Sequence, residues 1–258
     1  MNSCVLWGRL VTSGRLAIGL LIAFFSLLPA HAQDARQIVA ESQKRSQSKS
    51  LQYEGTLEIL GSANKVSVKH WEFARTGSFG ASKSILRFTA PAEVKGVALL
   101  IVNHPDRASD QWMWTPGLGR DRHIALQNRA TGFFGTGFSF EDLEERDADR
   151  YDVKLLADQG NAWKIESRPL KSSQYTYFYF WIEKDRYTFR KIEAYNKRGL
   201  VRVIEYKNYQ QVKGLWTAQL TEVSDVIRKS RTTLKYDKLD YNLPSKDDEF
   251  TLEALRRE

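Results

Sequence analysis

Thiols are nearly absent from this chain of 258 residues. Its single cysteine, Cys4, lies in an N-terminal segment that we expect to be removed, so the remaining protein would have no disulfide and no thiolate ligand for a metal. Beyond that segment histidine occurs only at His70, His104 and His123, at spacings far wider than those of local metal-ligand pairs. The sequence therefore predicts neither a metal site nor a cofactor.

The common enzyme motifs are missing as well. The chain contains no Gly-x-Ser-x-Gly elbow and no phosphate-binding loop, and its two Gly-x-Gly pairs lack the third glycine of a dinucleotide site. Adjacent acids such as Glu141 and Asp142, or Glu144 and Glu145, are expected on a solvated helix face rather than in catalysis. We therefore expect a protein that is not an enzyme and that has no catalytic residues.

No hydrophobic run reaches the roughly 20 residues that a membrane-spanning helix needs. The apolar run of residues 16–28 follows the basic Arg9 and Arg15 and precedes small residues at positions 30 and 32, a pattern typical of a cleaved signal peptide. We expect a signal peptide over residues 1–32, a single domain over 33–258 and a soluble periplasmic protein. An uncleaved membrane anchor is the alternative.

The net charge of the chain indicates its binding partners only weakly. The formal net charge is +8, yet basic and acidic residues alternate along most of the chain and no long basic block stands out. In an exported protein this balance favours transient contact with anionic membrane surfaces or acidic partners over nucleic acid.

Hydrophobic periodicity predicts a protein that is mainly β. Residues 34–49 read as a polar helix with a narrow stripe of Ala35, Ile38, Val39 and Ser42, after which the period becomes two. About a dozen strands with short gaps follow, which favours consecutive antiparallel pairing. The expected strands are 52–59, 66–75, 85–89, 96–102, 111–115, 120–125, 151–157, 162–168, 176–183, 188–196, 201–209, 216–224 and 231–241.

The centre of the chain differs from the strands on both sides. Residues 132–140 combine three glycines with four phenylalanines and then turn acidic. Ser139 and Asp142 have the spacing of a helix N-cap and its reciprocal acid. We expect an aromatic loop running into a short helix, a composition that suits a lid with Gly132, Gly135 and Gly137 as its hinge.

Aromatic residues exceed what a flat sheet can bury. Trp112 and Trp114 share one strand face, and Tyr177, Tyr179 and Trp181 share another. So many strands must curl, and the concave side then either packs on itself or encloses a cavity. For any single aromatic residue, an ordinary core position carries at least equal weight.

Three arginines form a second feature. Arg120 and Arg122 alternate along one expected strand, and Arg129 follows closely. They are either solvated rim charges that pair with the acids after Phe140 or contacts for an anionic lipid head group or an acidic partner.

Several motifs together resemble the outer membrane lipoprotein-sorting protein family, whose members are LolA-like. The residues that carry the resemblance are 88–100, 112–124, 129–133 and 135–143, with later matches at 180–184, 214–216 and 250–255. The resemblance implies an unclosed antiparallel half-barrel of about 11 strands, whose concave apolar side is covered by a few short helices.

The same resemblance implies a function. It points to a periplasmic carrier or accessory protein that binds a lipid or lipoprotein acyl chain in a hydrophobic cavity, with a possible inner-membrane exporter of the resistance-nodulation-division type as partner. A structural adaptor that docks on such an exporter is the alternative. By motif and alternation the candidate ligand-binding residues are Phe73, Phe88, Leu99, Ile101, Trp112, Trp114, Phe133, Phe134, Phe138, Phe140, Tyr177, Tyr179 and Trp181.

Overall fold

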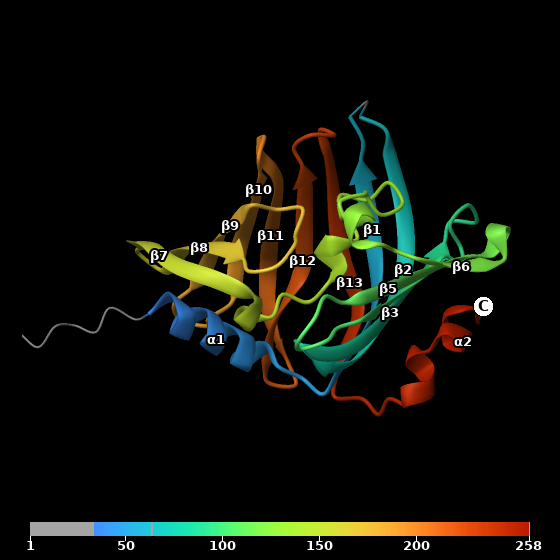
Figure 1. The fold of residues 1–258 in the computed structure, drawn as a ribbon, viewed down its shortest axis with the longest axis horizontal. Coiled ribbons are helices and arrows are strands. Elements are labelled where there is room, and N and C mark those ends of the chain that lie inside the picture. The colour runs from blue at the N-terminus through green and yellow to red at the C-terminus, as the bar shows by residue number, and fades with distance from the viewer. Residues whose placement is uncertain (1–33, 63, 258) are drawn as a thin grey trace, which may run out of the picture. The chain divides into compact units, whose positions relative to one another are not determined.

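Alternating apolar and polar residues fold into a single sheet of thirteen antiparallel strands in residues 34–62 and 64–257, the part of the chain that this computed structural model describes (Figure 1). The expected signal peptide and the residue that follows it lie outside the described residues. The strands are β1 (Ser50–Leu60), β2 (Val66–Ser78), β3 (Ala81–Ala90), β4 (Ala98–Val102), β5 (Asp110–Thr115), β6 (Arg120–His123), β7 (Tyr151–Gln159), β8 (Ala162–Pro169), β9 (Tyr177–Glu183), β10 (Phe189–Asn196), β11 (Gly199–Val212), β12 (Leu215–Asp225) and β13 (Ser230–Tyr241).

Each of these strands overlaps one expected from the sequence, so the mainly β fold is confirmed, with two strands more than the eleven or so that the resemblance implied. Consecutive strands pair within two meanders, β1 to β6 and β7 to β13. The meanders join where β1 pairs with β13, for example at Leu57 and Leu234. The sheet does not close, because its edge strands β6 and β7 have no partner on their outer sides in the described sheet.

This order forces one segment across the sheet. Strands β6 and β7 are consecutive in the sequence but lie at opposite edges. The crossing segment, residues 124–150, must therefore span the width of the sheet, and it lies within the curl rather than around the outside (Figure 1). It contains only short 3-10 turns: η2 (Leu126–Asn128), η3 (Glu141–Leu143) and η4 (Ala148–Arg150).

The two faces of the sheet carry different clusters. Leu99 and Ile101 of β4 pack with the large cluster inside the curl, whereas Ala98 and Leu100 pack with a smaller cluster outside it. We call these the concave and convex faces. Successive side chains along a strand thus point alternately to the concave and the convex face.

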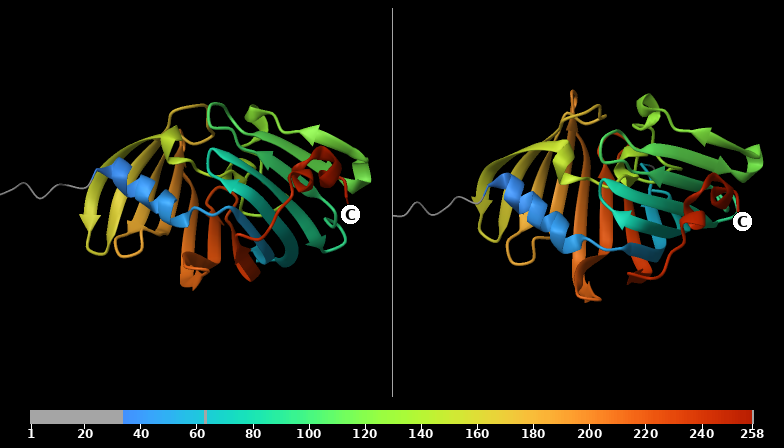
Figure 2. Two further views of the ribbon diagram at one scale, coloured as in Figure 1. Left: turned by 90° about the horizontal axis from the view of Figure 1, so that it is seen from below. Right: turned by 60° about the horizontal axis from the view of Figure 1, so that its bottom comes forward.

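Helix α1 (Ala35–Ser46) covers part of the concave face (Figure 2). The Asp34 side chain caps it by accepting from the Arg36 amide at 3.2 Å. Its buried residues are the four predicted from the sequence, so this helix is confirmed. Its stripe joins the concave cluster through Ile38 and Val39.

The second helix is on the other face. Helix α2 (Leu252–Leu255) and the turn η5 (Asp247–Phe250) pack Leu255 and Phe250 against Leu100 on the convex side. The expectation that the short helices cover the concave side therefore holds for α1 and for the turns of the crossing segment, and is wrong for α2.

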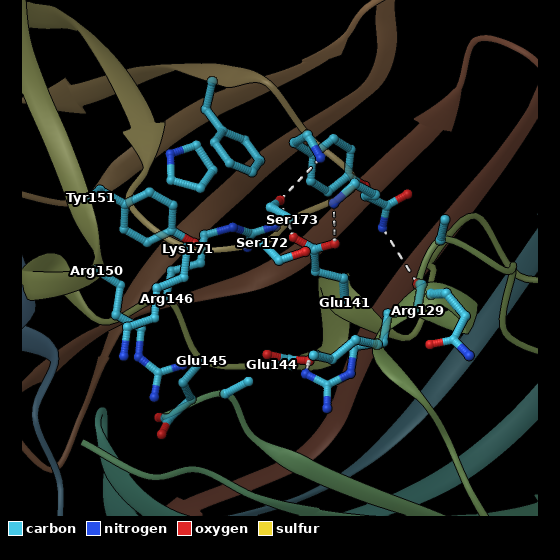
Figure 3. A pocket seen from close by; sticks show the side chains of 18 residues that line it. Arg129, Glu141, Glu144, Glu145, Arg146, Arg150, Tyr151, Lys171, Ser172 and Ser173 are labelled. Atoms are coloured by element: carbon cyan, nitrogen blue, oxygen red, sulfur yellow. Dashed lines mark hydrogen bonds and ion pairs between the residues drawn. The ribbon is translucent and has the colours of Figure 1, made fainter. Parts of the chain in front are cut away.

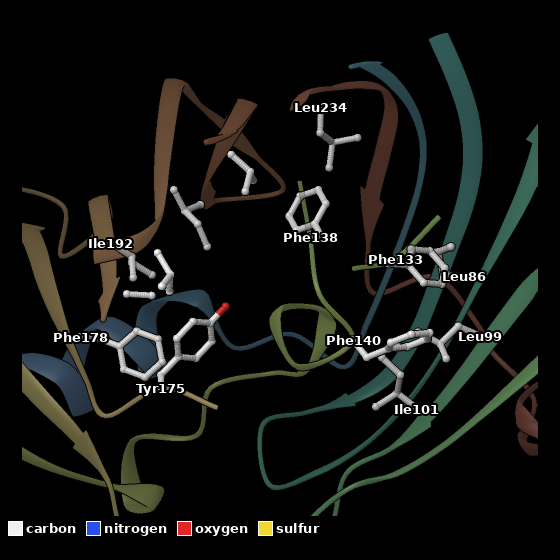
Figure 4. Close-up of a cluster of buried hydrophobic side chains, with 14 of the residues drawn as sticks. Leu86, Leu99, Ile101, Phe133, Phe138, Phe140, Tyr175, Phe178, Ile192 and Leu234 are labelled. Atoms are coloured by element: carbon white, nitrogen blue, oxygen red, sulfur yellow. The ribbon is translucent and has the colours of Figure 1, made fainter. Parts of the chain in front are cut away.

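Phenylalanines of the crossing segment fill much of the concave face (Figure 4). Phe133 stacks on Phe88 of β3 with ring centroids 5.4 Å apart, and Phe138 lies 6.0 Å from Trp71 of β2. All four side chains are buried. These aromatic side chains therefore stabilise the curled sheet, since burying each large apolar side chain contributes about 1.5–3 kcal/mol.

Candidate functional site

Packing on the concave face leaves a cavity of about 380 Å³. Most of its lining is apolar or aromatic, with Tyr53, Phe73 and Tyr236 on the strand side and Phe138 on the crossing segment. Tyr53 stacks on Phe73 at 4.9 Å and meets Tyr236 edge-on at the same distance. This volume lies within the roughly 300–1,000 Å³ of small-molecule sites. We call it the apolar cavity.

A second cavity of about 430 Å³ lies between the crossing segment and the strands β7 and β9 (Figure 3). Tyr151 and Phe178 supply apolar wall, but most of the lining is polar or charged. We call it the polar cavity. Its charged residues are Arg129, Arg146, Arg150, Lys171, Glu141, Glu144 and Glu145.

Arg146 stands between the two cavities. It lines both of them, together with Glu144 and Glu145. Its guanidinium carbon is 5.5 Å from the centroid of Phe178, and its side chain is only 18% exposed. Burial disfavours its charge, but Tyr151, Tyr206 and Asp142 outweigh that effect and raise the pKa of Arg146.

A buried network of charged side chains lies next to Arg146 and includes Asp142, which also lines the apolar cavity. The carboxylate of Asp142 accepts hydrogen bonds from the Ser139 amide and hydroxyl, both at 2.7 Å, and forms an ion pair with Arg202 of β11. Arg202 also reaches Asp225 of β12 at 3.1 Å. Although burial disfavours its charge, the two carboxylates together with Tyr175 raise the pKa of Arg202. This network ties the crossing segment to two strands.

The reciprocal hydrogen bonds expected of Ser139 and Asp142 are present, since the Asp142 amide also donates to the Ser139 hydroxyl at 3.3 Å, but the N-cap of η3 is Phe140 and not Ser139. The expectation that the acids here form a solvated helix face is wrong. Asp142 has no exposed side-chain surface, and Glu144 is paired with Arg129 at 2.7 Å. Alternation of apolar and polar residues could not predict the burial of these acids, because they lie outside the strands.

Glu141 lies at the edge of the polar cavity, and each of its carboxylate oxygens accepts a hydrogen bond. It accepts from the hydroxyl of Ser173 and from the amide of Gln174, the latter at 2.9 Å. Burial raises the pKa of Glu141, although these hydrogen bonds oppose the rise. Burial likewise raises the pKa of Glu144, and Arg129 only partly offsets it.

The three arginines predicted to act together are separated. Arg129 is buried: its guanidinium donates to the Ser109 hydroxyl at 2.9 Å as well as to Glu144. Arg120 and Arg122 are exposed on the edge strand β6, where their charge also keeps the edge from pairing with another chain. Only Arg129 lines one of the two cavities.

The three candidate hinge glycines have different surroundings. Gly135 has φ +75°, a left-handed conformation, and open space around it, which suits a turn or hinge. Gly137 is packed: a Cβ there would lie 3.0 Å from the Val223 carbonyl oxygen, and its amide donates to the Thr232 hydroxyl at 2.7 Å. A Cβ on Gly132 would collide with Arg228. Close approach of backbone therefore accounts for Gly137, whereas at Gly132 the neighbour is the end of a flexible side chain that can move.

Five of the thirteen candidate ligand residues lie on the convex face, so the expectation that they line the concave cavity is wrong. Trp112 and Trp114 alternate with Met113 and pack with the convex cluster beneath α2. Tyr177, Tyr179 and Trp181 alternate with Phe178 and Phe180, which belong to the concave cluster. Strand β9 is aromatic on both faces, so the sequence alone could not show which of its faces is concave.

The remaining eight candidates are on the concave side, but they fall into three groups. Phe73 and Phe138 line the apolar cavity. Phe134 is partly buried and packs edge-on against Phe133 at 5.3 Å. The other five are fully packed core residues, namely Phe88, Leu99, Ile101, Phe133 and Phe140.

Sequence reasoning missed several charged residues of the cavities and of the network, although Arg129 had been singled out as a candidate head-group contact. Arg146, Arg202 and Asp225 were not singled out, since charged residues are frequent and each reads as ordinary surface. The signal that could have drawn attention is the acidic start of η3 directly after an aromatic loop, because acids that follow buried residues are often buried themselves.

Within residues 34–62 and 64–257 the structure shows no group of three or more His, Cys, Asp or Glu side chains arranged to hold a metal ion. In the same residues no helix is both long and apolar enough to span a bilayer.

Comparison of the structure with solved ones defines the fold class as LolA-like. A domain described as that of an outer membrane lipoprotein-sorting protein from Vibrio parahaemolyticus matches with a TM-score of 0.82 at 24% identity, covering 86% of this chain and 98% of that one. A LolA superfamily protein from Nitrosomonas europaea matches with a TM-score of 0.69 at 19% identity, covering 86% and 99%. The resemblance seen in the sequence is therefore confirmed for the fold.

A DUF1329 family protein from Desulfovibrio piger is similarly close, with a TM-score of 0.81 at 22% identity and coverage of 86% and 97%. The model of a protein family whose description reads "-like: Uncharacterized protein" matches residues 80–257, and the chain belongs to that family. No curated protein sequence matches the chain.

Proposed function

We propose that this protein is a periplasmic carrier that binds an acyl chain of a lipid or lipoprotein in the apolar cavity and moves it between membranes. The observation that carries the proposal is that cavity: a half-barrel of LolA-like fold keeps about 380 Å³ free among aromatic side chains. Each buried methylene of an acyl chain would contribute about 0.8 kcal/mol, before the cost of ordering the chain.

Two further features support a carrier. The cavity is bounded by the crossing segment, in which Gly135 has the left-handed conformation of a turn and open space around it. The expected signal peptide supports a location in the periplasm, where an apolar ligand would need a shielded path through water. An exporter of the resistance-nodulation-division type and a transient membrane contact are proposed as donor or acceptor of the ligand.

Mass spectrometry of an organic extract tests the proposal directly. The protein is purified without detergent from a native-like periplasm, and its intact mass also reports whether the chain begins near Gln33. A lipid present in stoichiometric amount supports the carrier. A protein that carries no lipid and takes up none when lipid is added contradicts it.

A matched pair of variants locates the ligand. Phe73→Ala removes a stacked aromatic side chain from the apolar cavity, whereas Tyr177→Ala removes one from the convex face, where it stacks on Tyr195 at 4.6 Å. We expect Phe73→Ala to weaken the uptake of a fluorescent apolar probe by about tenfold to a hundredfold, from the roughly 1.5–3 kcal/mol of a buried Phe side chain. Tyr177→Ala should leave uptake unchanged. Equal effects of the two would contradict the assignment.

The second candidate is a structural adaptor that docks on a membrane exporter. The density of the concave core favours it, because Phe88, Phe133 and Trp71 are fully buried and fill much of the curl. The convex face would then bind the partner through the half-buried Tyr177 and Tyr179, the latter with the ammonium of Lys164 above its ring. Saturable uptake of an apolar probe decides between the two candidates, since an adaptor should show none.

A further inference from the structure

Three cations that line the polar cavity lack a close carboxylate partner. Arg150 donates to the carbonyl oxygens of His104 and Arg107, and Lys171 donates to a third carbonyl. Neither forms an ion pair with any residue that the structure describes. Arg146 reaches only Asp142, at 3.5 Å, and that carboxylate is already paired with Arg202.

The carboxylates of the same cavity are engaged elsewhere. Glu144 and Glu145 are paired with other arginines, whereas Glu141 accepts only from neutral donors and so offsets one of the three cations. Their partners are Arg129 and Gln111 for Glu144, Arg75 and Ser82 for Glu145, and Ser173 and Gln174 for Glu141. The polar cavity therefore keeps an excess of positive charge in a partly buried setting, where charge interactions are stronger than in water.

Arg146 has hydrogen-bond donors to spare. A guanidinium carries five N–H donors in a planar fork, and here a single long contact to Asp142 uses one of them. The group is held against Phe178 and lines both cavities. A ligand that spans the two cavities must pass Arg146.

We propose, on the basis of the carrier function above, that the ligand is an anionic amphiphile. Its compact anionic head group, a carboxylate or a phosphate, binds Arg146 in the polar cavity, with Arg150 and Lys171 nearby. Its acyl chain lies in the apolar cavity between Phe73 and Phe138. Arg146 is suited to this task because its fork matches the oxygens of a carboxylate or phosphate in pairs.

This arrangement also excludes ligands. A neutral head group would leave the excess charge of the cavity unpaired, and a cationic one would be repelled. The polar cavity thus selects by charge, whereas the apolar cavity selects by length and shape.

The test compares two ligands that differ only in the head group. Delipidated full-length mature protein is titrated with myristate and with myristyl alcohol, each in competition with a fluorescent apolar probe. The variants are Arg146→Met, which removes the charge while keeping the bulk, Arg146→Lys, which keeps the charge, and Arg168→Met as a control on the convex face. Lysophosphatidate, run beside myristate, distinguishes a phosphate from a carboxylate preference.

We expect the wild-type protein to prefer myristate over the alcohol. Arg146→Met should weaken myristate binding by about tenfold to a hundredfold, the effect of one charge-assisted hydrogen bond, and leave alcohol binding unchanged. Arg146→Lys should retain most of the preference, and Arg168→Met all of it.

The outcomes separate the inference from the function on which it rests. If the wild-type protein binds acid and alcohol equally well, the carrier stands and the head-group site is overturned, whether or not any variant folds. A preference for myristate that survives Arg146→Met overturns the role of Arg146. If no amphiphile competes with the probe, the carrier function itself fails.

Discussion

Arg202 shows how a buried charge is accommodated in this molecule. Its side chain is 7% exposed, yet carboxylates contact it from two sides, Asp142 on the crossing segment and Asp225 on β12. A buried ion pair of this kind adds little net stability, but removing one partner is costly, because the other charges are left uncompensated.

Arg202→Met is therefore expected to lower the free energy of unfolding by about 3–5 kcal/mol, since two buried carboxylates lose their partner. Urea denaturation followed by tryptophan fluorescence measures it. Arg168→Met is the control: Arg168 pairs with Glu166 at 2.8 Å with half of its side chain exposed, so the loss should be about 0–1 kcal/mol. Equal losses in the two variants would show that the network does not hold the crossing segment.

Ionisation of Glu141 is expected to lower the free energy of unfolding of the protein as pH rises. Burial raises the pKa of Glu141 in the folded protein, so the proton binds more tightly in the folded than in the unfolded state. The stabilising contribution of that proton is complete below the ordinary glutamate pKa of about 4.3 and is lost as pH rises through the raised value.

Glu141→Gln, which cannot ionise, should escape that loss. We expect the stability of the variant relative to the wild type to increase as pH rises from about 4 to about 7. Urea unfolding at several pH values measures this, with Glu253→Gln as the control, because the Glu253 side chain on α2 is exposed. A difference between variant and wild type that does not change with pH would be inconsistent with a raised folded-state pKa.

At the residue scale the sequence allowed only part of the site to be predicted. Phe73 and Phe138 were predicted because aromatic residues at alternating positions or in a glycine-rich loop are conspicuous. Trp112 was assigned to the wrong face because period two tells which residues share a face but not which face is concave. Arg146 and Arg202 were missed because burial of a charge depends on partners distant in the sequence.

At the scale of elements, the crossing segment is the part of the fold that controls the site. It supplies Phe138 to the apolar cavity, Arg146 to both cavities and Asp142 to the network. Its position is fixed where Gly137 meets β12 and β13.

Gly137→Val should loosen that contact. The new side chain would begin 3.0 Å from the Val223 carbonyl oxygen, and such overpacking costs about 1–3 kcal/mol. The free energy of unfolding measures it. Gly117→Ala is the control, since no atom lies within 4 Å of a Cβ there and the change should stay within about 0.5 kcal/mol. A neutral Gly137→Val would mean that the segment is not anchored at this point.

The strands were predictable because each buries one face and therefore repeats with period two. The crossing segment was predicted as an aromatic loop, but not its path, because the path follows from which strands become edges. That depends on the pairing of β1 with β13, between residues such as Leu57 and Leu234. Local periodicity has no information on partners so far apart.

At the scale of the whole molecule, the C-terminal segment closes the convex face. Phe250 and Leu255 bury Leu100 and partly cover Trp112 and Trp114. The guanidinium of Arg87 adds a hydrogen bond to the carbonyl oxygen of Ala254 at 2.9 Å. The segment of residues 250–255 is thus part of the packed structure.

Phe250→Ala should therefore lower the free energy of unfolding by about 3–5 kcal/mol, the cost of a Phe truncation in a core. Phe250 is 3% exposed, whereas Leu118, 62% exposed, offers the control Leu118→Ala with an expected change within about 0.5 kcal/mol. Thermal or urea unfolding measures both. A small loss at Phe250 would show that the convex cluster does not depend on the C-terminal segment.

The pairing of β1 with β13 also determines when the sheet can form during synthesis, because its central pair joins strands from the two ends of the chain. A chain is synthesised from its N-terminus, so β1 exists long before its partner on one side. Until residues 230–241 have emerged, β1 presents an open row of backbone donors and acceptors, which can template pairing with another chain. Such distant pairing also slows folding. The nascent chain is therefore the state most exposed to aggregation, and it is there, rather than in the finished protein, that a chaperone would have most to contribute.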